Sequence, residues 1–209
     1  MKIIILLISI VYSIDETILI NSSSFTDWKY FSFANDKIEE VIIQNPSDSN
    51  EWDLGIMRNH FRTNSGKSGN AIGGVIVDSV NVFNNESWDD LNSIYGQVNF
   101  SEDGMLNNIY DIVSHTYSSA PGSIVLETWG WFDFDNNYTF NLTNHQFIIR
   151  SANGNGFIKL WPFNYYSESG SSGHISFLYN MNIDCNHGMD QFGYCGGNPS
   201  LDIKENNLP

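Results

Sequence analysis

The sequence predicts an all-β fold, a predominantly antiparallel sandwich or barrel-like sheet with few or short helices. Two observations lead to this prediction. Short apolar or alternating runs follow one another along the 209 residues and are separated by turn-forming segments rich in Gly, Asn, Ser and Pro. No long segment repeats its apolar residues with the period of an amphipathic helix. Many short strands separated by turns are typical of β-sandwiches and barrels.

The first half of the chain contains a short apolar run and four predicted strands. Trp28–Phe33 alternates like a half-buried strand, and Ile38–Ile43 returns after a turn at Asn35–Lys37. A loop follows at Asn45, because Asn-Pro and the small polar residues after it favour a turn. The apolar run is Thr17–Asn21, and the four strands are Trp28–Phe33, Ile38–Ile43, Trp52–Met57 and Ala71–Val82.

The second half begins less regularly and ends in further strands. Asn84–Asn92 is polar and turn-like, and Met105–Tyr117 is expected to form one irregular segment or a short helix. Ile124–Phe134 is strongly aromatic. Ala152–Asn155 predicts a hairpin turn, and Pro162 should end a strand or mark a bulge. The strands expected here are Tyr138–Leu142, Gln146–Ser151, Gly156–Leu160 and His174–Asn180.

The charge balance limits the ligands that the chain can attract. Lys and Arg together number 9 against 24 Asp and Glu, which gives a formal net charge of -15. Such an acidic protein is a poor match for nucleic acid or for an anionic membrane surface. An anionic ligand would therefore need a local group of cations.

One stretch, Trp52–Gly74, gathers such cations. A strand-like run leads into Arg58, His60 and Arg62, and a turn-forming segment with Lys67 follows. Gly and Asn tolerate positive φ, so this segment should reverse direction or run close to another part of the chain.

The stretch resembles the signature of the HmuY-like family, secreted or surface haem-binding proteins of Bacteroidetes-type bacteria. A second run, Phe147–Gly154, resembles another string of that family, and the resemblance extends from Trp28 to Tyr179. It implies a β-rich, non-catalytic protein that binds haem (iron protoporphyrin IX). The signature positions are Trp52, Asp53, Gly55, Arg58, Arg62, Thr63, Asn64, Gly66, Ser68, Gly69, Gly73 and Gly74.

The resemblance also directs attention to iron ligands in the middle of the chain. Family members use His or Met from loops there, and the matching region offers Met105, His115 and His145 as axial ligand and metal candidates. A second ligand is expected in the turn Asp133–Tyr138, which contains no His or Met. Tyr138 is the side chain in this turn that we expect to be able to bind iron. The alternative for each candidate is a structural role without iron binding, because most Met residues fill cores and most lone His residues are hydrogen-bonded or on the surface. His60 is a weaker candidate and His174 is expected to be structural.

Arg58, Arg62 and Lys67 are the candidates for the haem propionates and the pocket. The alternative is that Arg58 and Arg62 pair with Asp or Glu on adjacent strands.

The two ends of the chain predict export. Met1-Lys2 followed by the apolar run Ile3–Val11 is typical of a signal peptide, which we assign to residues 1–13; a buried first strand is the alternative. Residues 14–180 would form the HmuY-like β domain. The first cysteine is Cys185, so no lipobox Cys and no lipid anchor are expected. No other stretch is apolar enough to span a membrane.

Residues 181–209 form a Cys-, Gly- and Asn-rich tail, interpreted as a linker. In an exported chain, Cys185 and Cys195 should form a disulfide. The alternative is a metal-binding knuckle that includes His187 and Met189.

The sequence lacks strong enzyme motifs. Gly66-Lys67-Ser68 is reminiscent of a phosphate-binding loop, but the position five residues before Gly66 is Phe61 instead of Gly. No Gly-x-Ser-x-Gly motif or paired-His zinc motif occurs. The first hypothesis is a secreted haemophore-like protein that captures haem for iron acquisition and passes it to a TonB-dependent outer-membrane receptor. The alternative is a non-catalytic β-sandwich interaction module that has lost its haem ligands.

Overall fold

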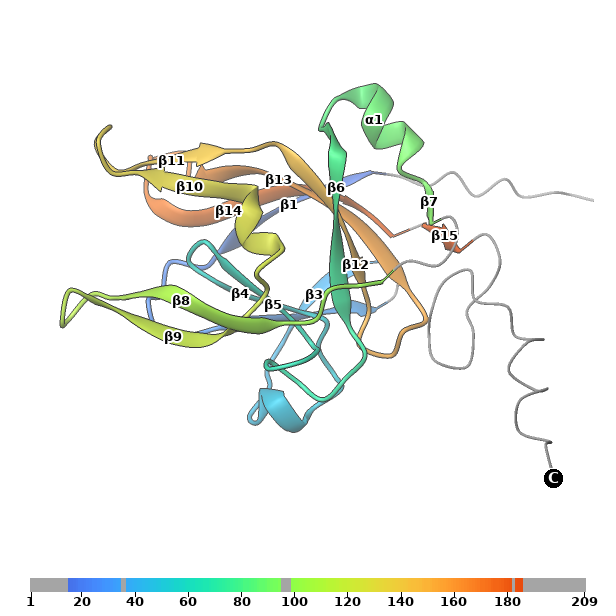
Figure 1. Ribbon diagram of the computed structural model, residues 1–209, viewed down its shortest axis with the longest axis horizontal. Coiled ribbons are helices and arrows are strands. Elements are labelled where there is room, and N and C mark those ends of the chain that lie inside the picture. Colours follow the sequence, from blue (N-terminus) through green and yellow to red (C-terminus); the bar gives the residue numbers. More distant parts are fainter. Residues whose placement is uncertain (1–14, 35–36, 95–98, 182, 186–209) are drawn as a thin grey trace, which may run out of the picture.

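The computed structural model describes residues 15–34, 37–94, 99–181 and 183–185. Its strands form a five-stranded sheet, a four-stranded sheet and three two-stranded sheets within those ranges. The two larger sheets are antiparallel throughout. The predicted all-β fold is thereby confirmed (Figure 1).

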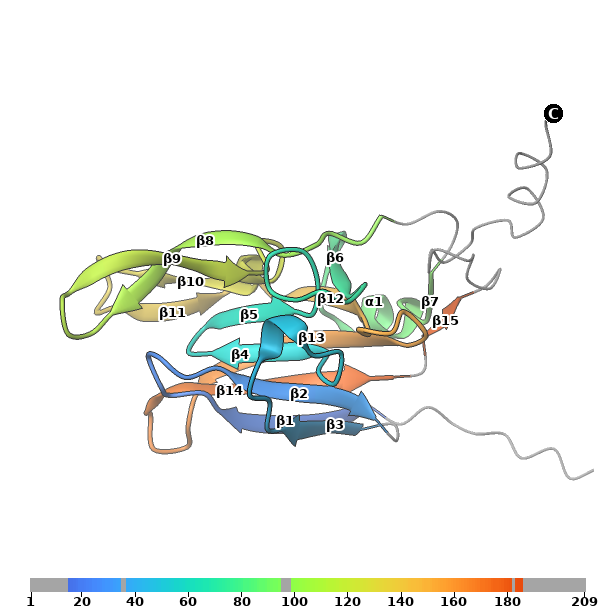
Figure 2. The ribbon, with the colours of Figure 1, turned by 90° about the horizontal axis from the view of Figure 1, so that it is seen from below.

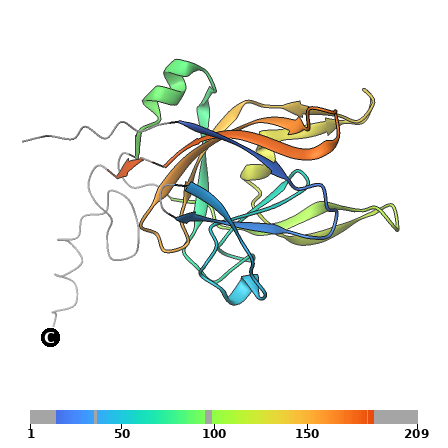
Figure 3. The ribbon, with the colours of Figure 1, turned by 180° about the vertical axis from the view of Figure 1, so that it is seen from behind.

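The five-stranded sheet joins the two ends of the domain. Its first strand, β1, pairs with the last long strand, β14, and the two lie side by side in the view from behind (Figure 3). Along β14 every second residue is buried, as expected for a strand with one face toward a core. The order is β1 (Glu16–Asn21), β14 (Ser172–Asn180), β13 (Phe157–Tyr166), β12 (His145–Arg150), β6 (Gly74–Val82).

The four-stranded sheet contains the signature stretch. Strands β4 and β5 form a tight hairpin whose two-residue turn is Arg58-Asn59. The order is β3 (Lys37–Val41), β2 (Lys29–Ala34), β4 (Leu54–Met57), β5 (His60–Thr63). A short 3₁₀ helix, η1 (Pro46–Asp48), lies between β3 and β4.

The two larger sheets enclose one hydrophobic core. Leu54, Ile56 and Phe61 come from the four-stranded sheet and pack in one cluster with Phe147 and Ile158 of the five-stranded sheet; all five are 0 % exposed. Burial of such side chains is the main favourable term in folding, at about 25 cal/mol per Å² of apolar surface.

Two hairpins project from the same end of the molecule (Figure 1, Figure 2). The first joins β8 (Gly104–Asp111) to β9 (Thr116–Gly122), and the second joins β10 (Gly130–Asp133) to β11 (Thr139–Leu142). Each is a two-stranded sheet of its own. Between them the chain forms the 3₁₀ helix η2 (Leu126–Trp129).

The sequence predictions for two segments were wrong. Met105–Tyr117 is neither irregular nor helical, because it forms most of the β8–β9 hairpin. The polar segment predicted as a turn contains the short helix α1 (Asn85–Asp90). Reciprocal hydrogen bonds between Asn84 and Ser87 cap that helix at its N-terminus, and capping of this kind is what allows a polar segment to start a helix.

The other strand predictions agree in position with the structure. Strand β13 continues through Pro162, with a shift in register between Pro162 and Asn164, so this proline marks a bulge. Among the described residues no helix is long and apolar enough to cross a membrane.

The predicted signal peptide lies outside the described residues, and so does most of the tail. The described start of the tail docks on the domain: β15 (Asp184–Cys185) pairs in parallel with β7 (Ser93–Ile94), and Ile183 is buried. Cys185 is disulfide-bonded, whereas Cys195 lies outside the described residues, so their pairing stays a prediction.

Candidate haem site

The signature stretch forms a buried polar framework. The carboxylate of Asp53 accepts hydrogen bonds from the backbone N–H groups of Phe33 and Ala152, at 2.6 Å each, and thereby joins the two larger sheets. Burial raises the pKa of Asp53, although both N–H groups act to lower it. Asn64 donates from Nδ2 to the carbonyl oxygens of Ser49 and Trp52.

Asp103 is the centre of the turn that follows β5. Its carboxylate accepts hydrogen bonds from Thr63 N, Thr63 Oγ1 and Ser68 Oγ, at 2.9, 2.7 and 2.6 Å. Its backbone oxygen accepts a further bond from the N–H of Lys67. Burial raises the pKa of Asp103 to about 6 against the lowering effect of these donors. The signature turn therefore wraps around one carboxylate that directly precedes β8.

The three candidate cations differ in their surroundings. Arg62 is held in place: Nε donates to Pro121 O at 2.9 Å, Nη1 donates to Tyr30 Oη at 3.0 Å, and the guanidinium lies 3.6 Å above the Trp28 ring. Burial lowers the pKa of Arg62. Lys67 is exposed on the turn. Neither Arg58 nor Arg62 forms an ion pair with a carboxylate that the structure describes, which argues against the alternative of paired strand charges.

Arg58 lies between groups that contact the two hairpins. Its guanidinium is 4.1 Å from the Phe25 ring centroid, and Phe25 packs edge-on against Tyr110 of β8. The guanidinium also lies 5.7 Å from the Tyr165 ring centroid, and Tyr165 contacts Phe132 of β10. Of the three cations, Arg58 is thus the one linked to both hairpins through these aromatic contacts.

His115 occupies the tip of the first hairpin and is exposed. Its backbone has a φ of 55°, a left-handed conformation that the tight turn requires. Its Nδ1 lies 2.6 Å from the hydroxyl of Tyr110. When Nδ1–H donates to this hydroxyl, the lone pair is on Nε2, which is the arrangement that orients metal-binding histidines in proteins.

Met105 and His145 lie elsewhere. Met105 is 43 % exposed at the base of the first hairpin, where it pairs with Pro121. Met105 and Asp111 are six positions apart along the strand, or about 20 Å, so Met105 and the tip residue His115 do not ligate one iron in this arrangement. His145 begins β12 and is half-buried, with Nδ1 3.3 Å from Thr128 Oγ1. In the described chain, no hydrogen bond or ring contact joins any two of Met105, His115 and His145.

The second hairpin carries a row of aromatic rings toward its tip. Phe140 and Phe132 are in ring contact near the core, Phe132 contacts Phe134, and Phe134 contacts Tyr138. Trp131, Phe134 and Tyr138 are more than half exposed. Ile112, Val113 and Tyr117 are likewise exposed on the first hairpin. An apolar macrocycle needs walls of this kind, and their exposure at one end of the molecule is unusual for a soluble surface.

The other two histidines that the structure describes, His60 and His174, have structural partners. His60 is 4 % exposed, and its Nδ1 lies 3.0 Å from Oε2 of Glu127. His174 lies on β14, with Nδ1 3.2 Å from Ser171 O, in agreement with its expected structural role.

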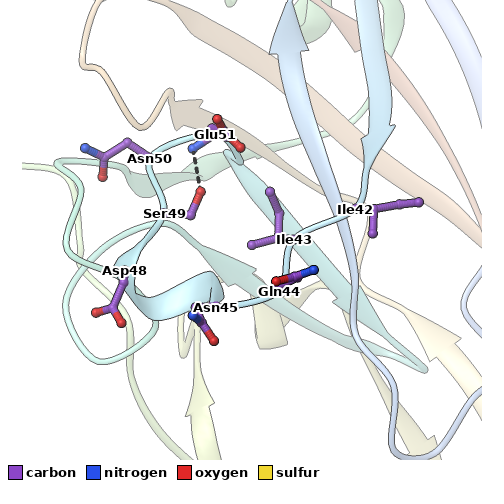
Figure 4. Close-up of a pocket in the computed structure, with 8 residues that line it drawn as sticks. All are labelled: Ile42, Ile43, Gln44, Asn45, Asp48, Ser49, Asn50 and Glu51. Carbon is purple, nitrogen blue, oxygen red and sulfur yellow. Dashed lines mark hydrogen bonds between the residues drawn. The ribbon is translucent and has the colours of Figure 1, made fainter.

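A depression of about 690 Å³ lies at the loop between β3 and β4 (Figure 4). Its lining comes entirely from residues 42–51, the loop around η1, where the N–H of Glu51 donates to Ser49 Oγ. It contains no His or Met and few apolar groups, so it is a poor site for haem. In the part of the chain that the structure describes, no group of three or more His, Cys, Asp or Glu could hold a metal ion.

The sequence matches the model of the HmuY protein family over residues 24–179. The chain belongs to the HmuY family. This confirms the resemblance that the signature stretch indicated. Among curated proteins, none shows significant sequence similarity to the chain.

Solved structures of HmuY-like proteins share the fold. One, from Bacteroides vulgatus and designated an HmuY-like heme-binding protein, is 20 % identical with a TM-score of 0.60; the match covers 79 % of this chain and 90 % of that one. The apo HmuY analogue of Tannerella forsythia is 15 % identical with a TM-score of 0.58, covering 81 % and 96 %. A lipoprotein of Bacteroides fragilis is 20 % identical with a TM-score of 0.59, covering 79 % and 88 %. At these identities the likeness shows the fold alone.

Sequence reasoning did not find four residues that organise this HmuY domain. Asp103, Glu127 and Tyr110 belong to no string that resembles the family, whereas Tyr165-Tyr166 follows the family's order of segments without any sign of a binding role. Asp103 lies two residues before the ligand candidate Met105, and a carboxylate in that position was the one available signal. The others act through partners distant in sequence, which a single chain does not reveal.

Proposed function

We propose that this HmuY-family protein is a non-catalytic haem-binding protein that captures haem between its two projecting hairpins. The observation that carries the proposal is the set of exposed apolar and aromatic side chains on both hairpins, together with His115 at the tip of one. Family membership supports it. Haem requires apolar walls, an iron donor and a partner for its propionates.

His115 is the first axial ligand in this proposal, because it is exposed and its Nδ1 is hydrogen-bonded to Tyr110. Met105 and His145 are the other candidates. His145 could join His115 after a movement of the first hairpin, whereas Met105 belongs to that same hairpin, about 20 Å from its tip, and would replace His115 as a ligand instead of pairing with it. Tyr138, at the tip of the second hairpin, is the alternative donor for the second position. Arg58 is the cation best placed for a propionate, ahead of Arg62 and Lys67.

The proposal includes export by the segment 1–13 and transfer of haem to a TonB-dependent outer-membrane receptor for iron acquisition. These two parts rest on the sequence and on the family, and they are independent of the geometry of the hairpins.

A hemin titration of the protein tests the proposal. Saturable binding with a sharpened Soret band is expected, and low-spin α and β bands in the reduced form would identify two strong-field ligands. The variants Met105→Ala, His115→Ala and His145→Ala then identify the donors, and His174→Ala is the matched control. If the spectrum remains identical to that of free hemin, the haem proposal is wrong. The exposed hairpins would then favour the interaction module as the function.

A further inference from the structure

Tyr165 has a buried hydroxyl without a partner. The residue is 1 % exposed, and its Oη has no hydrogen-bond partner in the described structure. A buried hydroxyl left unpaired costs free energy, so most such groups in folded proteins bind another polar group, a water or a ligand. Burial raises the pKa of Tyr165 to about 12, so the group is a neutral O–H donor at physiological pH.

Arg58 places a positive charge next to this ring. Its guanidinium carbon lies 5.7 Å from the Tyr165 ring centroid. Its hydrogen bonds run to Ser172 and Ser23, and two of the three are long, at 3.5 Å. No described carboxylate pairs with Arg58. The guanidinium of Arg58, which has no counterion among the described residues, therefore lies near Tyr165, whose hydroxyl has no acceptor.

We infer that Arg58 and Tyr165 together bind one carboxylate of a largely apolar ligand, at the base of the space between the two hairpins. A carboxylate supplies what both groups lack, since its oxygens accept from the guanidinium and from the hydroxyl, and charge-assisted bonds of this kind are the strong ones. The inference rests on the proposed function, under which the carboxylate is a haem propionate, and it adds Tyr165 as a binding residue.

Access to the hydroxyl depends on the second hairpin. Phe132 and Phe140 lie against the Tyr165 ring, with centroids 5.6 and 4.6 Å away. Phe140 is fixed, because its N–H donates to the hydroxyl of Tyr166 at 2.9 Å. Phe132 is only half-buried and belongs to a two-stranded ribbon that pairs with no larger sheet. Phe132 pairs directly with Phe140 across this ribbon, so rotation of the Phe132 side chain, without movement of the ribbon, is the cheaper way to uncover the hydroxyl.

The experiment compares hemin with hemin dimethyl ester, in which both carboxylates are blocked. The intact protein is expected to bind hemin about tenfold more tightly than the ester. Tyr165→Phe should remove most of that preference by weakening hemin binding while leaving ester binding and the Soret position unchanged. Arg58→Asn, chosen because asparagine tolerates the positive φ of this residue, should do the same. Tyr179→Phe is the matched control, because its buried hydroxyl donates to Glu16.

The thermal stability of the ligand-free variants gives a second readout. Tyr165→Phe should be at least as stable as the parent protein, since it removes an unpaired polar group, whereas Tyr179→Phe should be less stable. A loss of stability in Tyr165→Phe would overturn the inference. So would an unchanged preference for hemin over its ester in both Tyr165→Phe and Arg58→Asn. Either result would leave the haem proposal standing. If the intact protein binds neither ligand, the haem proposal is wrong as well.

Discussion

The Nδ1 atom of His60 lies 3.0 Å from one carboxylate oxygen of Glu127 and 3.1 Å from the other. The same carboxylate accepts a hydrogen bond from Asn108 Nδ2 at 3.0 Å. His60 belongs to β5, Asn108 to β8, and Glu127 to η2, which leads directly into β10. One side chain therefore joins the four-stranded sheet to the first hairpin and to the start of the second.

Replacement of Glu127 by Ala should destabilise the fold by about 2–3 kcal/mol, because it leaves a buried imidazole without its acceptor. Urea unfolding followed by tryptophan fluorescence measures this change. Glu168→Ala, at an exposed loop position, is the control and should have no effect beyond about 0.5 kcal/mol. Equal midpoints for Glu127→Ala and the parent protein would show that the link between the hairpins contributes nothing to stability.

Asp103 predicts a dependence of stability on pH. Its folded-state pKa of about 6 lies above the value of 3.8 expected for an exposed Asp, so the folded protein holds this proton more tightly than the unfolded chain does. Its contribution to stability is greatest below pH 4 and is lost as the pH rises to about 6, by up to about 3 kcal/mol.

The comparison of the parent protein with Asp103→Asn isolates this effect from other carboxylates. Asn does not titrate, so the stability advantage of the parent protein should shrink between pH 4 and pH 6 and stay constant above that range. Urea midpoints at several pH values measure it. An advantage that instead grows with pH would mean that the three donors around the carboxylate outweigh its burial.

Tyr110 should influence haem binding without touching the iron. Its hydroxyl lies 2.6 Å from Nδ1 of His115 and would fix the ring for coordination through Nε2. Loss of such a partner typically weakens metal binding by about 10–100-fold. Tyr110→Phe should therefore weaken hemin binding, whereas Tyr117→Phe, which keeps the exposed aromatic ring and removes only its hydroxyl, should not. Hemin titrations of the two variants measure this difference. Equal hemin affinities of Tyr110→Phe and Tyr117→Phe would show that Tyr110 does not orient His115 as an iron ligand.

The sequence allowed the fold class and most strands to be predicted, because alternation and turn residues are local signals. The hairpin β8–β9 was missed because its residues are mostly exposed on both faces, so Gly104–Asp111 and Thr116–Gly122 show little alternation. The family followed from the signature, but the signature residues proved to build a framework around Asp53 and Asp103. The role of Arg58 between the hairpins depends on Phe25 and Tyr165, which are far from it in sequence, and no local pattern encodes such contacts.

The glycines of the signature turn provide the last test of that framework. Gly66 has a φ of 54°, in the left-handed region, and a Cβ placed there would collide with the backbone oxygen of Asp103. Gly170 also has a positive φ, of 82°, but a Cβ there would meet nothing within 4 Å.

Gly170→Ala should therefore show the backbone strain alone, about 1 kcal/mol, whereas Gly66→Ala adds a steric clash and should lose about 3 kcal/mol or more. Urea unfolding of both variants measures the difference. Similar losses in the two would mean that the signature turn can move away from Asp103 at little cost, and the glycine would then be required only for its φ.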